Sequence, residues 1–185
     1  MTAWRRPDWL ANRLNRRINR APSPILAHGM PWITVFLASV IPTWLVISSA
    51  PILPPFGFLV LLAWRQLRPG LLPIWAGLPL GLLDDLFSGQ PLGSAMLLWS
   101  LAMILLDIVE ARIPWRNFGL EWLMGAGIVA AYILAGLALA NVAGASTSVR
   151  VLAPQIIVSI LIYPLIARMV AMFDRLRLLP LVQAT

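Results

Sequence analysis

The sequence contains no cysteine, no lysine and a single histidine, His28. Without cysteine the chain can form neither a disulfide nor a thiolate metal site, and one histidine argues against a histidine-based metal site or catalytic triad. Charged side chains are also scarce, at 11% of the 185 residues. A soluble domain carries roughly 25%. This deficit of charge places the chain in a lipid bilayer.

Long apolar runs replace the missing charge: 60% of the residues are hydrophobic, and the mean hydropathy is +0.85. Crossing about 30 Å of hydrocarbon takes about 20 helical residues. Five runs reach or approach this length, at residues 32–50, 70–87, 92–109, 120–142 and 152–173. A sixth run, 52–64, is shorter and contains Pro54-Pro55. We therefore predict an all-α integral membrane bundle of six transmembrane helices, the second of them short.

The distribution of arginine predicts how these helices are oriented. Basic residues concentrate in cytoplasmic loops. Six crossings with both termini in the cytoplasm leave only Arg150 on the outer side, whereas five crossings would move Arg65 and Arg68 outside. This pattern explains the net charge of +7 as membrane sidedness, so we expect no nucleic acid among the partners.

The amino-terminal stretch is basic and polar, and we expect it to remain on the mature protein. Trp4, Trp9, Leu10, Leu14 and Ile18 stand among its arginines. This pattern fits a helix lying on anionic lipid, but also a disordered tail that only enforces orientation. We divide the chain into this segment (1–30), a six-helix membrane domain (31–174) and a short cytoplasmic tail (175–185).

The stretch 81–93, GLLDDLFSGQPLG, places two adjacent carboxylates at the end of an apolar run. If the run is helical, Gly77 and Gly81 share a face on which another backbone can approach closely. At about 100° per residue, Asp84 lies about 20° from Gly77 and Asp85 about 40° from Gly81. Both acids therefore flank the glycine face.

We expect Asp85 to cap the free amides of the next helix and so to lock a hairpin, while Asp84 faces water or a neighbouring donor. The reason is that a carboxylate at the carboxyl end of its own helix is electrostatically misplaced, whereas the next helix offers free amides. A ligand or partner contact is the alternative, since acids within a membrane are by default functional. Catalysis is disfavoured because adjacent carboxylates diverge by about 100° on a helix.

Other polar residues have simpler explanations. Asp107 and Glu110 lie one turn apart, followed by Arg112 and Arg116, which predicts an interfacial salt-bridge cluster or, alternatively, a docking patch for a cytoplasmic partner. Asp174 is expected to join a similar network with Arg168, Arg175 and Arg177.

Tryptophans and small residues also follow membrane patterns. Small residues in 120–142 are expected to support close helix packing within the bundle: Gly125, Gly127, Ala131, Ala135 and Gly136. Five tryptophans are expected near span ends, in an aromatic belt: Trp64, Trp75, Trp99, Trp115 and Trp122.

Two motifs resemble the MreD family of bacterial rod shape-determining membrane proteins. The first is Gly81-Leu82-x-x-Asp85-Leu86-x-Ser88-Gly89-x-x-Leu92-Gly93, and the second is Pro55-Phe56-x-Phe58-Leu59-x-Leu61-Leu62-x-Trp64. The resemblance covers nearly the whole chain. Two features depart from the family: Asp84 stands where an apolar or aromatic residue is usual, and the arginine-rich amino terminus is not a general family feature.

The resemblance implies a non-enzymatic subunit of the cell-wall elongation machinery in the bacterial inner membrane. Its implied partners are MreC, the actin-like MreB, and RodA with its class B penicillin-binding protein. It also implies a fold like that of the membrane substrate-binding subunits of energy-coupling-factor transporters. The structural or partner candidates are Gly77, Gly81, Asp84, Asp85, Gly89 and Gly93, with no catalytic residue, metal or cofactor.

A membrane substrate-binding subunit of a vitamin-type transporter is the alternative function. Its pocket would lie near Asp84 and Asp85. Against it, the outer loops are short and carry few hydrogen-bonding side chains, of which a polar ligand needs several.

Overall fold

The computed structural model describes residues 24–45, 53–112 and 117–177. Within these ranges the chain forms six α-helices and one 3-10 turn, and no strand. The elements are α2 (Pro24–Leu45), α3 (Phe56–Leu67), η1 (Ile74–Ala76), α4 (Gly77–Ser88), α5 (Ser94–Arg112), α6 (Phe118–Val142) and α7 (Val149–Arg177). The all-α prediction is confirmed for this part of the chain.

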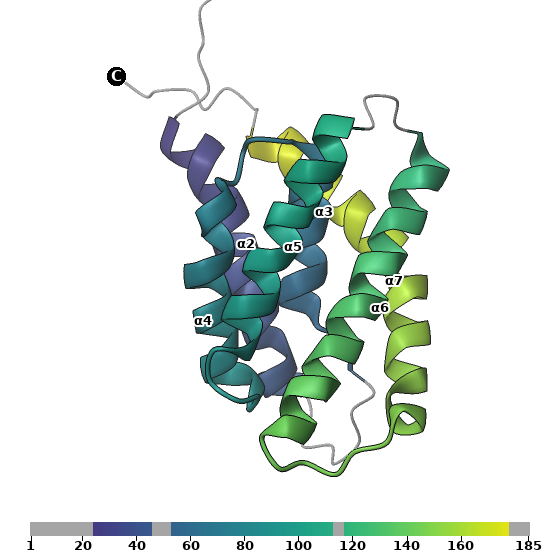
Figure 1. Ribbon diagram of the computed structural model, residues 1–185. Helices are drawn as coiled ribbons and strands as arrows, with labels where there is room; N and C mark the ends of the chain where they lie inside the picture. Colours follow the sequence, from purple (N-terminus) through teal and green to yellow (C-terminus); the bar gives the residue numbers. More distant parts are fainter. Residues whose placement is uncertain (1–23, 46–52, 113–116, 178–185) are drawn as a thin grey trace, which may run out of the picture.

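Successive helices run in opposite directions, so that every second connection lies at the same end of the bundle (Figure 1). The α4–α5 and α6–α7 turns lie together at one end, which is lower in Figure 1. The carboxyl-terminal ends of α3, α5 and α7 lie at the opposite end. We call these the acidic end, after Asp84 and Asp85, and the arginine end, after Arg65 and Arg68.

Helix α3 is short and occupies the middle of the bundle. Ten of its 12 residues are buried, and it contacts α2, α5, α6 and α7. At about 1.5 Å per residue it is about 18 Å long, well below the roughly 30 Å of a hydrocarbon core. The second predicted segment is thus a short helix that its neighbours shield from lipid.

The helix predicted over 70–87 begins later than expected. Gly70 has a φ of +84°, and Pro73 stands in extended backbone before the 3-10 turn Ile74–Ala76. Regular α-helix starts only at Gly77. The reason is local: a left-handed glycine and a proline without an amide hydrogen interrupt the apolar run, which hydrophobicity alone does not reveal.

The outer faces of the long helices are apolar, as expected for contact with lipid. Three helices are long and apolar enough to cross a membrane: Ser94–Arg112, Gly119–Val142 and Val149–Arg177. Two shorter apolar helices cover His28–Pro42 and Phe56–Leu67. The large exposed side chains on the three long helices include Leu97, Leu101, Leu105, Leu123, Leu134, Ile157, Leu161 and Leu165. A count of six crossings remains a prediction.

Not all tryptophans form an aromatic belt, contrary to the prediction. Trp75 is 60% exposed, but Trp64 and Trp99 are fully buried. Trp99 packs against Phe58, which in turn stacks on Tyr132 with ring centroids 4.1 Å apart. Position near a span end could not distinguish these roles, because helix packing and not depth in the membrane buries Trp64 and Trp99. Trp115 lies outside the described residues.

Several predictions fall on other segments that the structure does not describe. The proposed interfacial helix with its anionic lipid lies within residues 1–23, and most of the carboxyl-terminal tail within 178–185. The domain boundaries at residues 30 and 174 therefore remain predictions.

Candidate functional site

The acidic end is organised by Asp85, which is 3% exposed on α4. Its carboxylate accepts hydrogen bonds from the amides of Gly93, Ala95 and Met96, at 2.9, 2.8 and 3.2 Å. The Ser94 hydroxyl donates a fourth bond at 3.1 Å. The contact between Asp85 and the first amides of the next helix is the one that the capping hypothesis required.

The glycine face of α4 is filled by the backbone of α5. A β-carbon at Gly77 would lie 2.9 Å from backbone atoms of Trp99 and Ser100, and one at Gly81 would lie 2.7 Å from backbone atoms of Ala95 and Met96. Real β-carbons do not approach backbone so closely. Both glycines therefore serve contact within the chain, and this face is not open to a partner.

The turn between the two helices depends on left-handed glycines. Gly89 ends α4 with a φ of +67°, and Gly93 precedes α5 with a φ of +92°. Side chains other than glycine rarely adopt this conformation. The two glycines allow the chain to reverse within five residues, which brings the α5 amides to Asp85.

Asp84 points away from this cap, toward the middle of the bundle. It is 8% exposed, and one of its carboxylate oxygens would lie 3.1 Å from a β-carbon on Gly57 in α3. The hydroxyl of Ser39 on α2 lies in the same place, since that β-carbon would collide with it. Because Gly57 has no side chain, Ser39 of α2 and Asp84 of α4 can lie close together beside α3.

A cavity of about 300 Å³ opens beside Asp84. Its polar lining comes from the helices, with few contributions from loops: Ser39, Asp84, Ser88, Gln90, Tyr132 and Gln155. The argument against a ligand site counted only the outer loops and did not include these side chains from the helices.

The arginine end carries a second polar cluster, built around Arg65 of α3. The guanidinium is 3% exposed and lies 2.8 Å from both Asp107 and Glu110 of α5. Arg112, in contrast, is exposed. The predicted salt-bridge cluster exists, and Arg65 of α3 joins it, because the central position of α3 places Arg65 against α5. Arg116, the other predicted cation, lies outside the described residues.

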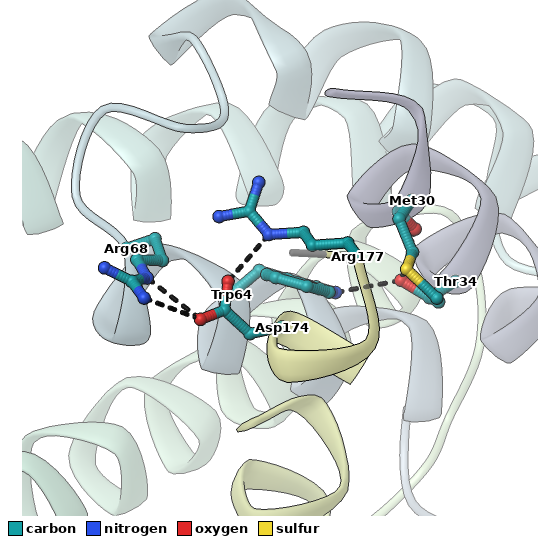
Figure 2. Close-up of polar contacts among 6 residues, drawn as sticks. All are labelled: Met30, Thr34, Trp64, Arg68, Asp174 and Arg177. Atoms are coloured by element: carbon teal, nitrogen blue, oxygen red, sulfur yellow. Dashed lines mark hydrogen bonds and ion pairs between the residues drawn. The ribbon is translucent and has the colours of Figure 1, made fainter. Parts of the chain in front are cut away.

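Asp174 of α7 has two basic partners (Figure 2). Arg177, three residues later, donates from Nε at 2.7 Å, and Arg68 donates from two nitrogens at 2.9 and 3.0 Å. Of the three predicted partners, only Arg177 is found, while Arg168 and Arg175 are exposed. Arg68 had been assigned to a separate loop, and the fold brings it to α7.

Trp64 joins this cluster to α2. Its indole Nε1 donates to Thr34 Oγ1 at 2.8 Å, and the Arg177 guanidinium lies over its ring at 5.7 Å from the centroid (Figure 2). The Thr34 hydroxyl in turn donates to the Met30 carbonyl at 2.9 Å. The arginine end therefore ties α2, α3 and α7 together through one buried tryptophan.

Only some of the small residues of α6 pack closely against a neighbouring helix. A β-carbon at Gly125 would collide with the ring of Tyr163 on α7, whereas one at Gly127 would meet nothing within 4 Å. Ala131 and Ala135 line an apolar groove of about 390 Å³ between α5 and α6. The prediction of close packing holds at Gly125 but not along this groove.

Sequence reasoning missed the polar groups around Asp84. Ser39, Tyr132 and Gln155 are each a polar residue within an apolar run. This is the sequence feature that could have marked them as candidate site residues. Hydropathy gave no reason to group them, because they belong to three different helices. Among residues 24–45, 53–112 and 117–177, no group of three or more His, Cys, Asp or Glu side chains is placed to hold a metal ion.

Comparison with known proteins identifies the family. The family model described as rod shape-determining protein MreD matches residues 25–177. No curated protein and no solved structure matches the chain. The match spans all six α-helices but for the first residue of α2, and includes both motifs. The chain therefore belongs to the MreD family of rod shape-determining membrane proteins.

Proposed function

We propose that the chain is a non-enzymatic scaffold of the cell-wall elongation complex, and that it holds MreC by contacts within the inner membrane. It crosses this membrane six times, with both termini in the cytoplasm. The family match over the helical bundle carries the proposal. The contacts of three charged side chains support the scaffold proposal, because Asp85, Arg65 and Asp174 each bind another helix of the same chain.

The other partners follow from the same role. MreB meets the cytoplasmic side, RodA and its class B penicillin-binding protein bind laterally, and the basic amino terminus binds anionic lipid. With charged groups at both ends of the bundle tied internally, the outer helix faces are the part left for protein partners within the membrane.

The groove between α5 and α6 is the proposed seat for the MreC transmembrane helix. Its lining is mostly apolar and includes the small residues Ala102, Ala131 and Ala135. Small residues favour helix association in lipid because they let backbones come close. The packing of α4 against α5 leaves no comparable room on the Gly77 and Gly81 face.

Copurification tests the proposal. The full-length chain is expressed with tagged MreC, extracted in mild detergent, and the amount of chain recovered with MreC is measured. Ala135→Phe fills the groove and is expected to reduce recovery at least tenfold. Leu123→Phe, a matched change on an exposed position of α6 outside the groove lining, is expected to leave recovery unchanged. Absence of the wild-type chain from the MreC preparation would refute the scaffold role.

The transporter alternative is supported by one observation, the polar cavity beside Asp84. A transporter subunit would be recovered with a pair of ATPases and a bound small molecule. Mass spectrometry of a preparation purified through a tag on the chain itself separates the two functions.

A further inference from the structure

We propose that the cavity beside Asp84 is a binding site for a small protonated amine. This site is distinct from the scaffold function, which places partners on the outer helix faces. Four helices supply its main polar groups: α2 supplies Ser39, α4 supplies Asp84, α6 supplies Tyr132 and α7 supplies Gln155.

The first observation is that two buried hydroxyl groups in this cavity lack hydrogen-bond partners. Ser39 and Tyr132 are 5% and 6% exposed, yet neither Ser39 Oγ nor the Tyr132 hydroxyl reaches full hydrogen-bond geometry with a described residue, although Ser39 lies beside the Asp84 carboxylate. A buried polar group left unpaired costs about 1–3 kcal/mol. Two such groups in one cavity indicate that a bound molecule completes their hydrogen bonding.

The second observation is the charge of the cavity. Asp84 is buried beside the two hydroxyls, and none of the described residues that line the cavity is basic. Asp85 cannot share a ligand with it, because the amides of α5 occupy that carboxylate. Arginines gather at the far end of the bundle, and Arg150, at the start of α7, is not part of the lining. A cation is therefore the missing partner of Asp84.

The third observation concerns hydrogen-bond polarity. Gln155 donates its amide hydrogen to the Leu53 carbonyl at 2.7 Å, which fixes the side chain and leaves its Oε1 as an acceptor. Together with the Asp84 carboxylate and the two hydroxyl oxygens, this makes a set of acceptors. A primary ammonium group, with three donors and one positive charge, matches such a set.

The size of the cavity favours an organic amine over a bare ion. Its volume of about 300 Å³ is at the lower end for small-molecule sites. Apolar side chains, among them Leu53, Phe56 and Phe87, complete the lining. A neighbouring hollow of about 350 Å³ shares Tyr132 and Gln155 and extends toward Thr147 in the α6–α7 turn. The apolar wall accommodates the carbon skeleton of the amine, while the acceptors hold its ammonium group.

Thermal unfolding of the full-length chain in detergent tests the site. The probes are ethanolamine, putrescine and glucosamine, with acetate and N-acetylglucosamine as matched compounds that lack the ammonium group. At least one amine is expected to raise the unfolding temperature, since a ligand at a hundred times its Kd disfavours unfolding about a hundredfold. The matched compounds are expected to have no effect.

Two variants locate the effect. Asp84→Asn keeps the shape of the side chain but removes its charge, and is expected to abolish stabilisation by the amine. Tyr132→Phe removes one hydroxyl and is expected to weaken binding at least fivefold. Asp107→Asn, at the arginine end, is expected to respond as the wild type does.

Two results would overturn the site. In the first, none of the three amines stabilises the wild type, as expected for a cavity that holds only water. In the second, Asp84→Asn retains the full response. Recovery of the chain with MreC is measured for the same variants, so that failure of amine binding and failure of the scaffold role are recorded separately.

Discussion

The carboxylate of Asp85 lies 2.8 Å from the amide nitrogen of Ala95, ten residues further along the chain. Together with the bonds from Gly93 and Met96, this contact gives the start of α5 a cap that comes from the preceding helix. A helix start buried without such a cap leaves several amides unpaired. The α4–α5 hairpin thus depends on one side chain.

Replacing Asp85 by Ala is expected to destabilise the protein by about 1–3 kcal/mol, because buried amides lose their acceptor. Asp84→Ala is expected to cost less, since it removes a buried charge that has no basic partner among the described residues lining its cavity. Thermal unfolding of both variants in detergent measures the difference. Arg112→Ala, at an exposed position in α5, is the control. Equal losses for Asp84→Ala and Asp85→Ala would contradict the capping role.

Adding a methyl group at Gly81 is expected to push α4 from α5. The new β-carbon would lie 2.7 Å from backbone atoms of Ala95 and Met96, which cannot rotate away. Overpacking of this kind costs about 1–3 kcal/mol. The matched change is Gly127→Ala in α6, where nothing lies within 4 Å. There the gain in helix propensity is expected to stabilise by up to about 1 kcal/mol. The two unfolding temperatures should shift in opposite directions, and a shared direction would count against close α4–α5 packing.

Removing the charge of Arg65, at the arginine end, is expected to lower the free energy of unfolding. Arg65→Gln removes the ion pairs of this buried guanidinium with Asp107 and with Glu110, which is 14% exposed. We expect a loss of about 3 kcal/mol, the low end for a broken buried pair, because Asp107 remains half exposed to solvent. Arg112→Gln, an exposed position in α5, is expected to change stability by less than about 0.5 kcal/mol. The double change Arg65→Gln with Glu110→Gln should recover part of the loss, and no recovery would show that the two do not interact.

The proposed topology is tested by introduced cysteines, because the chain has none of its own. Leu67→Cys stands at the arginine end and Ala145→Cys in the turn between α6 and α7. In intact spheroplasts a membrane-impermeant maleimide is expected to label Ala145→Cys alone. After the membrane is opened, both should react. Labelling of Leu67→Cys in intact spheroplasts, before the membrane is opened, would contradict the proposed topology.

The acidic hairpin was predictable because its determinants are local. Helical spacing placed Gly77 and Gly81 on one face, and the turn Ser88-Gly89-Gln90-Pro91 put the next helix within reach of Asp85. These relationships need only the helix period and the chemistry of a helix start.

The partners at the arginine end were not predictable, because they are distant in sequence. Arg68 and Asp174 are 106 residues apart, and Gln66 and Tyr163, whose side chains are joined by a 2.6 Å hydrogen bond, are 97 apart. Charge and hydropathy place such residues at one end of a membrane but do not say which helices are neighbours. The central position of α3 decides this, and α3 corresponds to the shortest of the predicted spans.

Helix α3 also has an electrical consequence. Under the proposed topology, the amine cavity and the arginine cluster lie at its opposite ends, about 18 Å apart along a helix of 12 residues. The stretch of helix between these two polar clusters is thus shorter than the roughly 30 Å of hydrocarbon in the surrounding lipid. A full crossing of a transmembrane voltage is worth about 2.3 kcal/mol per unit charge at 100 mV. We therefore expect a cation bound beside Asp84 to sense part of this voltage, so that its occupancy changes with the membrane potential.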